Sequence, residues 1–199
     1  MGMNQSIHDQ GLNIPAVTVN NNLLVASGTK VGIGTNDPKV PLDVFEMGGL
    51  YLGYTALAGS GASGSSYTAT TSYAVIDSTA KVTFTAPKSG KVEIRLQCYV
   101  EDLTTSDKIL YLALSDASSY NSIGAAYERF IYRADTEDEI TLNVRWMVSG
   151  LTAGTSYTYY IAARSNAASN YTIRWGGTDA DTYPYMLITA ISVPNTTAS

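Results

Sequence analysis

The stretch KVEIRLQCYV, residues 91–100, decides the fold class. Apolar side chains occupy every second position from Val92 to Cys98, and charged or polar side chains lie between them. A period of two is that of a β-strand with one buried face. EITLNVRW, residues 139–146, repeats the pattern with its apolar positions running from Ile140 to Trp146. Both stretches predict long strands that turn one face toward a core.

Outward from these two stretches, further strand-like segments follow one another at nearly regular spacing after Tyr67. Many such segments with turn residues between them predict an all-β chain, and a jelly-roll β-sandwich in particular. The expected strands are at about 73–77, 80–86, 90–100, 108–115, 123–133, 139–149, 156–165, 170–176 and 184–193.

Composition agrees with this class and excludes several functions. A chain of 199 residues with 45% apolar residues can bury one good core. Only 15% of the residues are charged, whereas Tyr (15) and Gly (17) are abundant, so we expect a neutral, hydroxyl-rich surface. A net charge of −5 matches a phosphate backbone poorly, and we therefore expect no nucleic-acid partner.

The single cysteine, Cys98, excludes an internal disulfide framework and a cysteine-built zinc site. No apolar run is long enough to span a membrane, and the amino terminus has neither the basic start nor the apolar centre of a signal peptide. We expect a protein that is soluble where it is made and does not insert into membranes.

The amino-terminal part differs from the rest. Residues 1–15 are polar and without periodicity, and they read as a docking tail. Residues 16–45 contain very short apolar pieces separated by turn residues, each too short to bury a core within one chain. This pattern predicts an intertwined β stalk in which several chains supply the missing faces.

VGIGTNDPKVPLDV, residues 31–44, resembles a segment that recurs in bacteriophage tail-fibre and related adhesin proteins. The resemblance is carried by Val31, Gly32, Ile33, Gly34, Thr35, Pro38, Leu42, Asp43 and Val44; Pro41 departs from the usual pattern. It implies a homotrimer whose stalk is held by Val31, Ile33, Leu42 and Val44. It further implies that the tail binds other virion proteins and that the protein is located in the virion after assembly from the host cytoplasm.

Residues 46–66 are rich in Gly, Ala and Ser and are expected to form a linker or a loose first strand, with a head domain at 67–199. Gly59, Gly61 and Gly64 fit a dinucleotide-binding spacing, but no apolar strand precedes them and no helix follows. We therefore expect no cofactor.

Two phrases in the head resemble trimeric jelly rolls of the C1q and tumour-necrosis-factor type and the receptor-binding heads of phage fibres. They are FTAPKSGKVEIRL, residues 84–96, and LTAGTSYTYYIAAR, residues 151–164. This resemblance implies a trimeric jelly-roll head with a receptor-binding role.

Catalysis finds little support in the sequence. The only histidine, His8, lies in the tail, so a serine-type triad is not expected. The acidic residues Asp135, Glu137, Asp138 and Glu139 could hydrolyse glycans or bind calcium, although such a cluster is more typical of a solvated loop. We expect neither an enzyme nor a resident metal.

Aromatic side chains with polar neighbours are the stronger candidates for a site, because sugars stack on rings and hydrogen-bond to nearby polar groups. The alternative is that Trp175 and the tyrosines fill the core or a subunit interface. The candidate receptor-binding residues are Tyr120, Tyr171, Arg174, Trp175, Asp179, Asp181 and Tyr183.

The leading hypothesis from the sequence is a structural virion protein, a trimeric phage fibre or spike whose head binds a host surface glycan without catalysis. Three copies of a weak site would gain avidity. A capsid decoration protein that reinforces the phage head and a polysaccharide-degrading enzyme are the alternatives.

Overall fold

The two alternating stretches become neighbouring strands of one sheet. In the computed structural model, β7 (Val92–Asp102) and β10 (Glu139–Val148) pair antiparallel, with Val92 opposite Val148 and Glu101 opposite Glu139. The inward apolar positions of both strands are buried, as the alternation predicts, except Ile140 near the start of β10, which is 38% exposed. The structure describes residues 31–33, 42–44, 49–102, 108–134, 139–168, 171–177 and 183–194.

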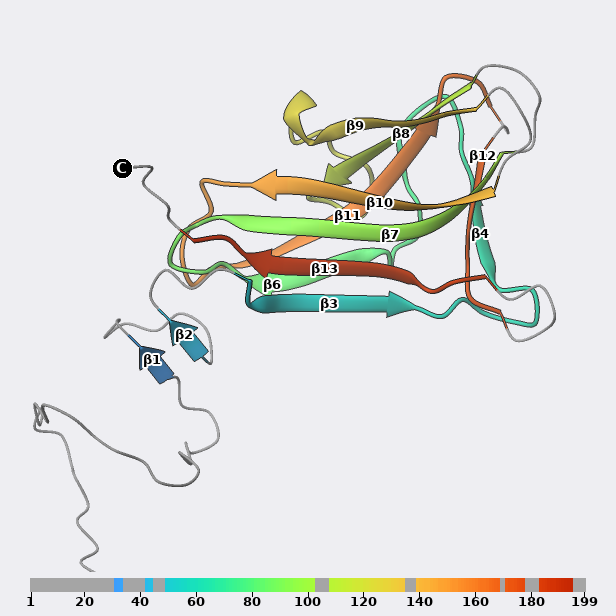
Figure 1. The fold of residues 1–199 in the computed structure, drawn as a ribbon. Helices are drawn as coiled ribbons and strands as arrows, with labels where there is room; N and C mark the ends of the chain where they lie inside the picture. Colours follow the sequence, from blue (N-terminus) through green and yellow to red (C-terminus); the bar gives the residue numbers. More distant parts are fainter. Residues whose placement is uncertain are drawn as a thin grey trace, which may run out of the picture.

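Four more strands complete this first sheet (Figure 1): β3 (Tyr51–Leu57), β4 (Ser65–Thr68), β12 (Tyr171–Trp175) and β13 (Met186–Ser192). β13 pairs with the first half of β7 and β12 with its second half. β3 and β4 pair in turn with β13 and β12. Across the sheet the order is therefore β3/β4, β13/β12, β7, β10.

The second sheet has the order β6/β5, β11, β8, β9. Its strands are β5 (Ala74–Val75), β6 (Lys81–Thr85), β8 (Lys108–Ser115), β9 (Glu128–Ala134) and β11 (Ser156–Ser165). A short 3-10 helix, η1 (Ala125–Tyr127), occupies the beginning of the strand expected at 123–133. No helix in the described part of the chain is long and apolar enough to cross a membrane.

The order in which the chain visits the two sheets is that of a jelly roll. β3/β4 lie in the first sheet, β5/β6 in the second, and β7 in the first again. β8 and β9 form a hairpin in the second sheet, after which β10, β11 and β12/β13 alternate between the sheets. The predicted all-β jelly-roll sandwich is thereby confirmed.

The inner faces of the sheets form one hydrophobic core. Its largest fully buried side chains include Trp146 and Ile94 from the first sheet and Leu112 and Ile161 from the second. Each is supplied by an inward position of an alternating strand, so the period-two pattern accounts for the core.

The phrases that carried the resemblance of the head lie side by side. β6 pairs with the start of β11, with Phe84 opposite Tyr157. The turn after β6 brings Gly90 against the loop between β10 and β11. A Cβ at Gly90 would lie 2.6 Å from the carbonyl oxygen of Leu151 in that loop. Because φ at Gly90 is also +63°, only glycine fits this position without strain.

Of the two expectations for residues 46–66, a linker and a loose first strand, the strand is the one that the structure shows, because β3 and the start of β4 belong to the first sheet. The head therefore begins by Gly49, whose N–H donates to the carbonyl oxygen of Ser192 at 2.9 Å. Glycine in this segment serves close packing: a Cβ at Gly53 would lie 2.5 Å from the carbonyl oxygen of Thr83 in the opposite sheet.

Within the expected stalk, β1 (Val31–Ile33) and β2 (Leu42–Val44) pair parallel, with Val31 opposite Leu42 and Ile33 opposite Val44. The short strands thus fall where the stub pattern predicts strands. The docking tail at 1–15 and the acidic residues Asp135, Glu137 and Asp138 lie outside the described residues.

Cys98 is buried on the inner face of β7, and burial raises the pKa of its thiol from 9.0 to about 12. The unfolded thiol releases its proton near pH 9 while the folded thiol keeps it, so rising pH favours the unfolded state between pH 9 and 12. We expect the free energy of unfolding, measured by urea titration, to fall by about 1 kcal/mol per pH unit above pH 9 from this group. A Cys98→Ala variant should show a flatter dependence; an unchanged slope would contradict the assignment.

Candidate functional site

Two of the candidate receptor-binding residues belong to the core. The inward positions of β12 include Tyr171 and Trp175, which are 0% and 3% exposed. Their rings cannot stack on a sugar from outside, and the alternative that they fill the core describes them correctly. Asp179 and Asp181 lie outside the described residues.

Arg174 and Tyr183 come together on the outer face of the first sheet. Arg174 Nε donates to Glu101 Oε2, and its guanidinium carbon lies 5.2 Å from the centre of the Tyr183 ring. Tyr183 in turn packs on Tyr99 at 5.1 Å between ring centres. The bond to Glu101 raises the pKa of Arg174, while burial, together with a hydrogen bond to Glu139, raises that of Tyr99. The side chains of this group thus make their polar and ring contacts with one another.

We expect Arg174→Ala to cost about 1 kcal/mol of stability, because the half-buried Glu101 carboxylate loses its charged partner. Arg145→Ala is the matched control: Arg145 lies 3.6 Å from Glu93 but is 68% exposed, so its loss should cost less. Urea unfolding of both variants at one protein concentration measures the difference. Equal costs would contradict the assignment of a stabilising role to the Arg174 pair.

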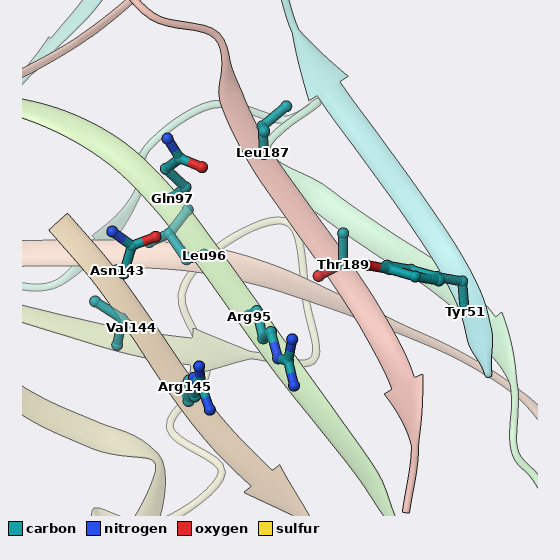
Figure 2. Close-up of a pocket in the computed structure, with 9 residues that line it drawn as sticks. All are labelled: Tyr51, Arg95, Leu96, Gln97, Asn143, Val144, Arg145, Leu187 and Thr189. Atoms are coloured by element: carbon teal, nitrogen blue, oxygen red, sulfur yellow. The ribbon is translucent and has the colours of Figure 1, made fainter. Parts of the chain in front are cut away.

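A shallow hollow of about 250 Å³ lies on the outer face of the first sheet (Figure 2). Arg95 and Arg145 stand directly opposite each other across β7 and β10. Glu93 contacts both, with 2.7 Å to Arg95 Nη2 and 3.6 Å to Arg145 Nη1. One carboxylate offsets only one of two positive charges, so the hollow can accept an acidic group. Its other lining residues are Tyr51, Leu96, Gln97, Asn143, Val144, Leu187 and Thr189.

The same face carries most of the exposed large apolar side chains. Tyr51 and Tyr54 of β3 are 70% and 62% exposed, and Met147 of β10 is 50% exposed. Their strand partners are the outward positions of β13 and β7, which places all three on the outer face. Tyr185, directly before β13, is 52% exposed. Several exposed aromatic and apolar residues on one face are typical of a protein–protein interface.

Tyr120 lies on the other sheet, apart from Arg174 and Tyr183. Its ring stacks on Tyr73 with 4.8 Å between centres. Both phenol groups donate to Glu128, from Tyr73 at 3.3 Å and from Tyr120 at 3.4 Å. Arg164 lies over Tyr73 at 4.9 Å and over Tyr111 at 3.7 Å. We call these five residues the tyrosine cluster.

The tyrosine cluster covers the outer face of the second sheet. Ala113 and Ala162 are opposite each other in β8 and β11 at outward positions, yet both are 0% exposed. They are not part of the main core between the sheets. The aromatic layer above them is therefore a separate packed unit, although its members remain partly exposed.

Sequence reasoning missed most of the tyrosine cluster and the whole hollow. Alternation shows that Arg95 and Arg145 point outward, but only strand register places them opposite each other. Arg164 and Tyr73 are far apart in the sequence and meet because β5 and β8 both pair with β11. The mixture of Tyr120 with Ser and Asn was the one usable signal.

No group of His, Cys, Asp or Glu that could hold a metal ion occurs among the residues that the structure describes. The calcium hypothesis for Asp135 to Glu139 depends largely on residues outside that part of the chain. Comparison of the sequence with models of known protein families and with curated proteins finds no match.

Proposed function

We propose that this chain is one protomer of a homotrimeric bacteriophage fibre or spike, a structural virion protein whose jelly-roll head binds a host surface glycan without catalysis. The observation that carries the proposal is the exposed aromatic face of the first sheet, formed by Tyr51, Tyr54, Met147 and Tyr185. The stalk segment and its resemblance to phage tail-fibre proteins support the same reading.

The short stretch of chain between the stalk and the head favours this face as the contact between copies. The chain between Val44 of the stalk and Gly49 of the head can span at most about 18 Å. Gly49 and Leu50 both hydrogen-bond to Ser192 at the end of β13, which fixes the point where the chain enters the head. Three chains joined at the stalk would therefore hold their β3 strands near a common axis.

The second sheet then faces away from the axis, which would leave the tyrosine cluster accessible in each copy. A trimer presents three equivalent sites, so weak contacts add up to useful avidity on a surface that displays many copies of a receptor. The net charge of −5 is compatible with a glycan receptor and unfavourable for nucleic acid.

Native mass spectrometry of the full chain tests the assembly. We expect a species of three times 21.2 kDa at micromolar concentration. A monomer under these conditions would overturn the trimer.

Antibody labelling of virions and competition of phage adsorption by the purified protein test the role. Labelled fibres together with reduced adsorption are expected. Labelling over the capsid without an effect on adsorption would instead favour a decoration protein, and shortening of host polysaccharide by the pure protein would favour an enzyme.

A further inference from the structure

The tyrosine cluster has the organisation of a preformed stacking platform. Tyr73 and Tyr120 are stacked with 27° between their planes, and the shared Glu128 carboxylate accepts a hydrogen bond from each phenol. Burial and the neighbouring Glu128 raise the pKa of Tyr73 to about 12, so its phenol stays protonated and continues to donate. Rings held in this way lose little conformational entropy when a ligand stacks on them.

The loop that carries Tyr120 is also held in place. Ser115 is fully buried, and its Oγ accepts from the N–H of Asn121 at 2.9 Å and donates to the carbonyl oxygen of Ala117 at the same distance. At the rim, Asn121 Nδ2 donates to Asp116 Oδ1 at 2.6 Å. Asp116 and Asn121 are both exposed and retain further hydrogen-bonding capacity.

A partly exposed ring in the same short loop as an exposed amide and an exposed carboxylate matches the chemistry of a pyranose, whose C–H face stacks and whose edge hydroxyls hydrogen-bond. We propose that Tyr120, supported by Tyr73, forms a saccharide-binding site on the outer face of the second sheet together with Asn121 and Asp116 of the same loop. The proposal rests on the proposed function in taking the head to be the receptor-binding part.

The charges of the site select the class of sugar. Glu128 and Asp116 contribute two carboxylates, while the Arg164 guanidinium lies against the Tyr73 and Tyr111 rings and that of Arg129 donates to the carbonyl oxygens of Ala126 and Glu128. An acidic sugar would meet the exposed Asp116 carboxylate of this loop, which disfavours uronic and sialic acids. The ligand is therefore an uncharged hexose or N-acetylhexosamine. The hollow lined by Arg95 and Arg145 on the first sheet has an excess of positive charge instead. Acidic sugars would therefore bind in the hollow and uncharged sugars at Tyr120.

Saturation-transfer NMR on the full chain tests the site with methyl glycosides of glucose, galactose, mannose and N-acetylglucosamine, and with glucuronic and N-acetylneuraminic acid. We expect transfer to at least one uncharged sugar and none to the acids. Tyr120→Ala should weaken binding at least tenfold, whereas Tyr120→Phe, which keeps the ring, should retain binding within about threefold.

Two variants control for the fold. Thr83→Ala changes an exposed residue of β6 on the outer face of the same sheet and should leave binding unchanged. Asn121→Ala changes only an exposed side chain of the rim and should weaken binding several-fold even if Tyr120→Ala proves unstable.

Binding of an acidic sugar that is lost in Arg95→Ala but kept in Tyr120→Ala would overturn the proposal and assign the site to the hollow. Absence of binding to every sugar, with a trimer that still competes with phage adsorption, would overturn this site and leave the proposed function standing. Sugar binding by a monomer that has no effect on adsorption would overturn the proposed function and leave this site standing.

Discussion

Replacing Tyr54 and Met147 together by glutamate should convert the trimer into folded monomers. Both side chains are at least half exposed in the single chain, and both lie on the outer face of the first sheet, at opposite edges. Native mass spectrometry and size-exclusion chromatography with light scattering, at matched micromolar concentration, measure the outcome.

The expected effect is large because each substitution acts three times in a symmetric assembly. Burial of a Tyr or Met side chain contributes roughly 1.5–3 kcal/mol, and a carboxylate placed in an interface without a partner costs several kcal/mol more. A threefold axis also brings like charges together. The single variants Tyr54→Glu and Met147→Glu should each weaken the trimer, and the double variant should dissociate it.

Thr83→Glu is the control for added charge, because Thr83 is an exposed residue of β6 in the second sheet. This variant should remain trimeric. A double variant that stays trimeric while Thr83→Glu dissociates would move the interface to the second sheet and remove the basis for an accessible tyrosine cluster. Unchanged circular dichroism spectra show that the variants are folded.

The positions of the strands, and which of their side chains face the core, were predictable because both depend on the alternation of apolar and polar residues along each strand. The expected strands at 108–115 and 156–165 coincide with β8 and β11, and the alternation in β7 and β10 predicts which side chains are buried. Nothing beyond the alternation of neighbouring residues is needed for this result.

The sequence did not separate a linker from a first strand at 46–66, because tertiary packing, not local preference, specifies β3 and β4. β3 contains Gly53 where the two sheets approach too closely for a Cβ. A composition rich in Gly, Ala and Ser is shared by linkers and by tightly packed small-residue strands, so the sequence alone does not separate them.

The candidate site was predictable only where one segment supplied the signal. The aromatic residues of β12 were noticed, but alternation within a five-residue strand did not separate the inward Tyr171 and Trp175 from the outward Arg174. Strand register and sheet order, which are long-range properties, bring Tyr73, Glu128 and Arg164 to Tyr120. The contacts of Tyr120 with these residues could not be predicted from residues that are neighbours in the sequence.

Trp146→Ala should be among the most destabilising single substitutions in the head. Trp146 is 0% exposed at an inward position of β10, opposite Ile94. Truncation of a buried Trp to Ala typically costs 3–5 kcal/mol, since a cavity remains after the transfer free energy is lost. Ile140→Ala is the matched control on the same strand and the same face, where 38% exposure predicts a much smaller cost.

Trp146→Phe separates the contribution of packing from that of the indole N–H. Trp146 Nε1 is buried and has no hydrogen-bond partner among the described residues, and an unpaired buried donor costs about 1–3 kcal/mol. Phe removes this donor while it keeps much of the ring volume, so the two effects oppose each other and the net cost should stay below about 2 kcal/mol. Urea unfolding at a fixed protein concentration, with unchanged m-values, measures both variants. If Phe and Ala were equally destabilising, the indole N–H and not packing would account for the role of Trp146.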